Sequence, residues 1–125
     1  MAAFYTIDRA NERIPELGEM LELLRGQRDE LRDLKAVHDT TPPGDDRRRL
    51  RLRMQGLVDQ MQATVARIDS WGITLRDIET GLIDFPALVN GRQVWLCWRL
   101  GEGPLEWWHE LDTGIAGRQR LADLT

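Results

Sequence analysis

One stretch decides the fold class: residues 83–99 read IDFPALVNGRQVWLCWR. Asn90-Gly91 at its centre is the strongest short-range signal of a two-residue hairpin turn, because both residues accept the positive φ angles that such a turn requires. The flanking residues are mostly aliphatic, aromatic or β-branched, which favours strands. A turn at this point pairs Phe85 with Leu96. The stretch therefore predicts an antiparallel β-hairpin.

A third strand is predicted over residues 105–111, after a turn over residues 101–104. We expect Trp98 opposite Trp107 and Leu96 opposite His109. Because side chains along a strand alternate between the two faces of a sheet, this register places Trp107 and His109 on the apolar face. The opposite, polar face is expected to carry Asp84, Trp95, Cys97, Arg99, Glu106, Trp108 and Glu110, with Arg99 directly opposite Glu106. Residues 73–75 are a candidate for a short fourth strand.

The first 72 residues predict two long helices that turn back on each other. Apolar residues recur at three- and four-residue steps from residue 15 to 39 and again from residue 50 to 71. Pro15 is expected in the first turn of the first helix, and Thr6 as the cap of a separate short helix over residues 7–13. Residues 40–46, TTPPGDD, cannot continue a helix. Gly72 is expected to end the second helix in a left-handed conformation.

Together these patterns predict an α+β protein with a single domain over residues 1–125. Residues 1–72 form a long antiparallel, coiled-coil-like helical hairpin, with Leu31 near Leu57 and Leu24 near Thr64. Residues 73–125 form a three- to four-stranded antiparallel β-meander. The apolar face of the meander is expected to pack on the helical hairpin.

Composition narrows the function classes. The chain has 125 residues and a formal charge of -4, which argues against a general affinity for nucleic acids or anionic membranes. An arginine-rich run over residues 47–53 is interpreted as a salt-bridged helix face opposite the acidic end of the first helix, with nucleic-acid binding as the alternative. No uncharged stretch approaches the length of a membrane span. A lone cysteine and the absence of a signal-like start lead us to expect a cytoplasmic protein.

Several segments resemble a known family. They are residues 81–87 (GLIDFPA), 91–102 (GRQVWLCWRLGE), 108–109 (WH) and 114–118 (GIAGR), together with residues 5–11 (YTIDRAN). The chain resembles, over nearly its whole length, the bacterial family catalogued as domain of unknown function (DUF) 2203. The resemblance implies no established activity, substrate or cofactor, but it places the distinctive residues in the C-terminal half. Ile115 departs from the family, where an aromatic residue is expected.

Histidine and cysteine are the side chains best suited to catalysis or metal binding. His109 is interpreted as a hydrogen-bonded core histidine, with Glu102 or Asp112 as the partner that orients it if it titrates. Alternation places Cys97 and His109 on opposite faces, which argues against a Cys-His nucleophile pair and against a catalytic residue at either position.

The chain lacks the Cys-x-x-Cys and His-x-x-x-His spacings of common metal sites, so no metal or other cofactor is expected. A carboxylate-rich set of Glu102, His109 and Asp112 is the alternative.

The favoured interpretation is a protein–protein interaction or scaffold module that forms a homo-oligomer through the helical hairpin; the sequence leans against an enzyme without deciding the question. The helices extend further than so small a sheet can cover, so their far end is expected to pair with another chain, most simply in a dimer. The alternative is a small-ligand or anion-binding protein, with catalysis left open. Its candidate binding residues are Asp84, Cys97, Arg99, Glu102, Glu106, His109 and Arg118.

Overall fold

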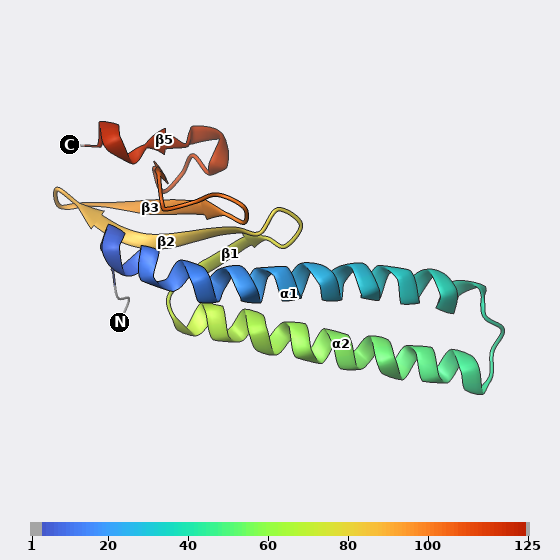
Figure 1. The fold of residues 1–125 in the computed structure, drawn as a ribbon. Coiled ribbons are helices and arrows are strands. Elements are labelled where there is room, and N and C mark those ends of the chain that lie inside the picture. The colour runs from blue at the N-terminus through green and yellow to red at the C-terminus, as the bar shows by residue number, and fades with distance from the viewer. Residues whose placement is uncertain (1–3, 125) are drawn as a thin grey trace.

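The computed structural model describes residues 4–124 and combines a helical hairpin with a five-stranded sheet. Helix α1 (Ile7–Thr40) and helix α2 (Asp45–Ser70) run side by side and extend well beyond the sheet (Figure 1). The strands are β1 (Thr74–Asp77), β2 (Leu82–Val89), β3 (Arg92–Arg99), β4 (Trp107–His109) and β5 (Gln119–Arg120). They are antiparallel and lie in the order β1-β2-β3-β4-β5. The predicted α+β class is confirmed, and the sheet is larger than expected.

Helix α1 is continuous through Pro15, so the predicted short helix before a new start at Pro15 is wrong. Thr6 caps the helix as expected, since its Oγ1 accepts a hydrogen bond from the Arg9 backbone N–H at 3.1 Å. A proline inside a helix removes one backbone hydrogen bond. Ala10 and Leu17, on either side of Pro15, are both fully buried in the core. Packing on both sides of the proline therefore keeps the first two turns in line with the rest of the helix.

The two helices meet in the expected antiparallel register. The Gln27 side chain donates a hydrogen bond from Nε2 to Gln60 Oε1 at 3.1 Å, midway between the predicted neighbours Leu24–Thr64 and Leu31–Leu57. Ion pairs between Glu30 and Arg53 and between Glu16 and Arg67 also join the helices. The pairing of Arg53 agrees with the interpretation of the arginine-rich run as a salt-bridged face. Gly72 has a φ of 76° just after α2, as its predicted capping role requires.

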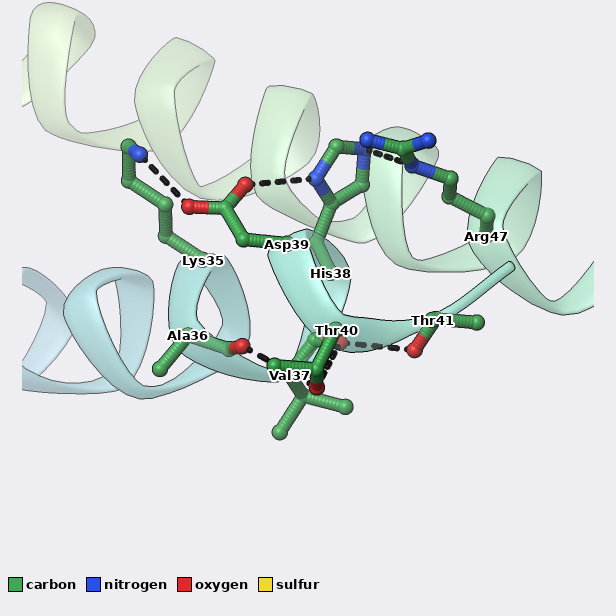
Figure 2. A network of polar contacts seen from close by, with 8 residues as sticks. All are labelled: Lys35, Ala36, Val37, His38, Asp39, Thr40, Thr41 and Arg47. Carbon is green, nitrogen blue, oxygen red and sulfur yellow. Dashed lines mark hydrogen bonds and ion pairs between the residues drawn. The ribbon is translucent and has the colours of Figure 1, made fainter. Parts of the chain in front are cut away.

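A polar network closes the far end of the hairpin (Figure 2). The Arg47 Nε donates to His38 Nε2 at 3.3 Å, and His38 Nδ1 lies 3.1 Å from Asp39 Oδ1. Because arginine can only donate, His38 Nε2 must accept, and its proton is then on Nδ1. A hydrogen bond from Lys35 Nζ at 2.9 Å and the contact with His38 lower the pKa of Asp39. His38 is thus part of the hairpin turn and lies apart from the sheet.

The β2–β3 hairpin has the predicted register, with Phe85 opposite Leu96. Asn90 and Gly91 have φ angles of 52° and 76°, the left-handed conformations that the turn needs. The candidate fourth strand is confirmed as β1, which pairs with β2 on the other side. Strand β5 was not predicted, because a strand of two residues is too short to produce a recognisable pattern in the sequence.

The predicted β3–β4 register is wrong by one residue. The structure places Trp95 opposite His109, Leu96 opposite Trp108 and Cys97 opposite Trp107. A one-residue shift moves each side chain of a strand to the other face of the sheet. Trp108 is therefore in the core, whereas Trp107 and His109 lie on the face that carries Cys97.

The connection before β4 explains this shift. The Trp98 indole Nε1 donates to the Gly103 carbonyl at 2.8 Å, and the Leu105 backbone N–H donates to Asn11 Oδ1 of α1 at 2.8 Å. Leu105 thus bonds to the helix and is not a strand residue, so β4 begins two residues later than predicted. Glu106 falls outside β4, and the β3–β4 pairing extends only from Trp95 to Cys97, so the predicted Arg99–Glu106 pair is absent.

A single core joins the helices to one face of the sheet, which we call the inner face. Its largest fully buried side chains include Leu17, Leu21 and Leu24 of α1, Ile68 of α2, and Ile83, Phe85 and Leu96 of the sheet. The opposite face, which we call the outer face, lies toward the C-terminal segment after β4 (Figure 1). Across residues 4–124, neither helix combines the length and apolar character that a membrane span requires.

Candidate functional site

Three strands bring Asp84, Cys97 and His109 together on the outer face. Asp84 of β2 and Cys97 of β3 are direct cross-strand partners. His109 of β4 stands opposite Trp95, two residues from Cys97 along β3, and is therefore a diagonal neighbour of Cys97. One donor atom from each of the three side chains lies within 4.8 Å of the others. The exposed fractions are 2%, 0% and 2%, so this polar cluster is as buried as the core.

His109 is fixed by two acceptors. Its Nδ1 lies 2.7 Å from the backbone carbonyl oxygen of Glu110, and its Nε2 lies 3.0 Å from Asp84 Oδ2. A carbonyl oxygen only accepts, so Nδ1 carries a proton and donates it. A second proton must lie between Nε2 and Oδ2, on the imidazole or on the carboxyl group. The predicted orienting partners, Glu102 and Asp112, are wrong, because Asp84 takes this role.

The Asp84 carboxylate has one satisfied and one unsatisfied oxygen. Oδ2 also accepts a hydrogen bond from Arg76 Nε at 2.9 Å. Oδ1 is buried and has no hydrogen-bond partner in the described part of the chain. Leaving a buried acceptor unpaired costs about 1–3 kcal/mol. The outer face thus contains an acceptor that is ready to take a partner.

The Cys97 side chain is a neutral thiol. Burial raises its pKa to about 12, the neighbouring Asp84 carboxylate acts in the same direction, and Arg118 opposes them. At neutral pH the thiolate is therefore scarce, and the thiolate is the form that acts as a nucleophile. Cys97 and His109 do lie on one face, contrary to the sequence prediction, but this thiol is not activated for nucleophilic attack.

Two arginines lie beside the cluster, each stacked on a tryptophan of the outer face. The guanidinium of Arg76 lies 5.0 Å from the ring centre of Trp95, and that of Arg118 lies 4.8 Å from the ring centre of Trp107. Such stacking orients a guanidinium. Arg76 was missed by sequence reasoning, which treated residues 76–81 as a connection. Arg76 is the unpaired residue where the β1–β2 register shifts, so strand alternation in the sequence does not place it, and its hydrogen bond to Asp84 Oδ2 shows that it lies on the outer face.

A small cavity lies over the cluster. It has a volume of about 280 Å³, and its lining includes Asp84 and His109 together with Arg76 and Asp112. Gly114 and Ile115 of the C-terminal segment form part of the wall. The segment after β4 therefore covers the cluster and forms a compartment over it.

The other candidate residues divide into two groups. Glu102 and Arg118 form an ion pair at 2.7 Å, and the Arg118 Nη2 also donates to the Cys97 carbonyl oxygen at 3.4 Å, so this pair lies next to the cluster without lining the cavity. Arg99 and Glu106 are exposed and do not line the cavity. The structure thus gathers Asp84, Cys97 and His109 and leaves Arg99 and Glu106 outside.

The gathered side chains supply three kinds of donor atom. A carboxylate oxygen, a thiol sulfur and an imidazole nitrogen are all ligands of transition-metal ions. Within residues 4–124 this is the one group of three or more such side chains whose donor atoms converge. The arrangement suits binding of an ion or a small polar molecule better than covalent catalysis by cysteine.

Comparison with known proteins gives a family and no activity. A family model described as "Uncharacterized conserved protein (DUF2203)" matches residues 3–121. None of the curated proteins and none of the solved structures compared with the chain matches it significantly.

Proposed function

The chain belongs to the DUF2203 family, whose description names no activity, and we propose that this member binds a small ligand on the outer face of its sheet. One observation carries the proposal: the buried Asp84 carboxylate has an oxygen without a partner, beside Cys97 and His109 and under a cavity. The ligand-binding residues are then Asp84, Cys97 and His109.

Energetics support a binding role for this cluster. Burying polar groups destabilises a fold unless every group is paired, and apolar side chains would fill the same space at lower cost. The cluster keeps a carboxylate, an imidazole and a thiol at exposures of 2% or less, and one oxygen is unpaired. A cavity of about 280 Å³ lies just below the usual size range of small-molecule sites, about 300–1,000 Å³, so the ligand is an ion or a very small molecule.

A thermal-shift screen tests the proposal. The purified full chain is heated with divalent metals, small carboxylates, phosphate and nucleotides. A ligand at about 100 times its Kd adds about 2.7 kcal/mol to the free energy of unfolding, which is a shift of several degrees in Tm. We expect His109→Gln and Asp84→Asn to abolish the shift, whereas Glu106→Gln, an exposed neighbour outside the cavity, retains it. Absence of any shift, or an unchanged shift in both cluster variants, would refute the proposal.

A second candidate function, self-association through the hairpin, has its own supporting observation. Beyond Gln27 of α1 and before Leu57 of α2, no residue of either helix is buried. Val37 and Leu52 in this far part of the hairpin are 52% and 62% exposed. Apolar side chains that are exposed on a helix pair gain stability when they pack against another helix pair. We infer a homo-oligomeric scaffold, most simply a dimer, in which the two far ends pack together.

Sedimentation equilibrium tests this second candidate. At micromolar concentration the full chain should sediment as a dimer, and a Leu52→Glu, Val37→Glu double variant should sediment as a monomer. Arg51→Glu, which changes a charge at a neighbouring exposed position, is the matched control and should remain dimeric. A monomeric wild-type chain would contradict the candidate.

We also propose that the protein works in a reducing compartment such as the cytoplasm, which keeps a lone cysteine thiol free. Both candidate functions are compatible with this location.

A further inference from the structure

The donor atoms of Asp84, Cys97 and His109 already lie close to the spacing of a zinc centre. Zinc binds carboxylate oxygen, thiolate sulfur and imidazole nitrogen at about 2.0–2.3 Å, so neighbouring ligands of a tetrahedral ion are about 3.3–3.8 Å apart. One carboxylate oxygen of Asp84, the Cys97 sulfur and one ring nitrogen of His109 lie within 4.8 Å of one another, on strands that hold their backbones in place. The widest of these separations therefore exceeds the tetrahedral spacing by no more than about 1.5 Å.

The orientation of His109 matches that of a metal ligand. Histidines that bind metals usually donate one ring N–H to a carbonyl or carboxylate, which fixes the ring and leaves the other nitrogen for the ion. His109 donates from Nδ1 to the Glu110 carbonyl and points Nε2 toward Asp84. The ring is therefore held in place by the backbone, and it would keep that bond with an ion present.

Asp84 has a free oxygen for the same ion. Its Oδ2 is held by Arg76 Nε at 2.9 Å, and its Oδ1 is buried and unpaired. Arg76 plays the part of an outer partner that orients the carboxylate while Oδ1 takes the inner position. The ion would thus satisfy the one acceptor of the cluster that the protein leaves without a partner.

Charge balance also favours a divalent ion. A metal ligand must lose its proton, so the ion displaces the proton of the Cys97 thiol and the proton between His109 Nε2 and Asp84 Oδ2, which are 3.0 Å apart. A divalent cation that displaces both protons into solvent leaves the net charge of the buried cluster unchanged. The large penalty for burying an extra charge is then avoided.

From these observations we infer that Asp84 Oδ1, Cys97 Sγ and His109 Nε2 bind a zinc-like divalent ion, whose fourth position opens to the cavity beneath residues 111–115. This inference deepens the proposed function and rests on it, because it names the ligand of the same site. Thiolate and imidazole select borderline metals such as Zn²⁺ and Co²⁺ over Mg²⁺ and Ca²⁺, which prefer oxygen. Three protein ligands and an open position are typical of sites that hold a water or a small anion on the metal.

Cobalt titration of the full chain, freed of metal by a chelator, tests the inference. We expect one equivalent of Co²⁺ to produce the visible bands of a tetrahedral ion and a thiolate-to-cobalt charge-transfer band, with release of about two protons per ion in weakly buffered solution. Zn²⁺ should abolish the bands by replacing Co²⁺, and a large excess of Mg²⁺ should leave them unchanged. Absence of a charge-transfer band at saturating Co²⁺ would overturn the inference.

Variants assign the ligands. Cys97→Ser should remove the charge-transfer band, and Asp84→Asn and His109→Gln should each weaken Co²⁺ binding at least about tenfold. His38→Gln is the matched control, because His38 is the other of the two histidines and lies at the far end of the hairpin. A band that persists in Cys97→Ser, or that disappears in His38→Gln, would show that the metal binds elsewhere. Circular dichroism of the metal-free variants checks that each is folded, and Cys97→Ala replaces Cys97→Ser if that variant is not.

The two proposals can fail separately. If no metal binds but a small anion or nucleotide stabilises the wild-type chain and not His109→Gln, the metal inference is wrong and the proposed ligand site stands. If neither metals nor other ligands act on the cluster, both are wrong.

Discussion

The centres of the two faces of the sheet are both buried, but they have opposite chemistry. On the inner face, Phe85 and Leu96 are fully buried in the hydrophobic core, and their side chains have no hydrogen bonds to make. On the outer face, Asp84 and His109 are 2% exposed and must satisfy charge and hydrogen bonds. The inner face accounts for the stability of the fold through the hydrophobic effect. The outer face adds little by that effect, and this is why we assign its polar cluster to binding.

The largest effect is expected on the inner face. Phe85→Ala removes a fully buried ring that also packs edge-on against Tyr5, with ring centres 5.2 Å apart. We expect the free energy of unfolding to fall by about 3–5 kcal/mol in urea denaturation. A loss below about 1 kcal/mol would mean that this face is not the core.

Adjacent tryptophans give a sharper test, because they point to opposite faces. Trp108 is 5% exposed and packs in the core, whereas Trp107 lies on the outer face, beside Arg118. Trp108→Ala should destabilise the protein by about 3 kcal/mol, and Trp107→Ala by about half as much or less. Urea denaturation of the pair measures the difference, and the reverse order would support the register predicted from the sequence.

Alkaline pH should reveal the buried thiol. In the unfolded chain the Cys97 pKa returns to its usual value of about 8.5, and in the folded chain it is raised to about 12. Between these values the unfolded state has lost the proton that the folded state keeps, so stability falls as pH rises from about 8.5 to about 12. Cys97→Ser lacks this group, and its stability should fall less over the same range.

Chemical modification provides a second measurement of the same thiol. At pH 8 iodoacetamide should react with the folded chain at least about tenfold more slowly than with the urea-unfolded chain. Equal rates would show that Cys97 is exposed or ionised.

The smallest effect is expected at the outer-face candidates that the structure leaves in solvent. Arg99→Ala and Glu106→Gln should each change the free energy of unfolding by no more than about 0.5 kcal/mol, and neither should change ligand-induced shifts in Tm. A loss of ligand stabilisation in either variant would mean that the site extends beyond the buried cluster.

Local signals in the sequence were sufficient where neighbouring residues determine the structure. Asn90-Gly91 fixed the turn and therefore the whole β2–β3 register, which placed Asp84 beside Cys97. The heptad spacing similarly predicted the pairing of the two helices, which Gln27–Gln60 confirms.

The β3–β4 register could not be predicted from the sequence, because contacts between residues far apart in the chain determine it. The bond from the Leu105 N–H to Asn11 joins residues far apart in the chain, and it decides where β4 begins. That shift of one residue moved His109 from the apolar face to the side of Cys97, which turned an expected core histidine into part of a polar cluster. Pro15 was misjudged for the same kind of reason, since burial of Ala10 and Leu17 outweighs the local signal of proline.

The central claim is that the buried outer-face cluster serves binding and not stability, and replacing the whole cluster by apolar residues tests it most directly. Asp84→Ala alone should destabilise the protein, by about 1–3 kcal/mol, because it leaves His109 Nε2 unpaired. The triple variant Asp84→Val, Cys97→Ala, His109→Leu leaves no buried partner unpaired, since Arg76 reaches solvent and the Glu110 carbonyl oxygen still accepts from Thr113. In urea, without ligand, we predict that the triple variant is at least as stable as the wild type and binds no Co²⁺. A loss of more than about 3 kcal/mol in the triple variant would contradict the account and make the cluster a structural element of the fold.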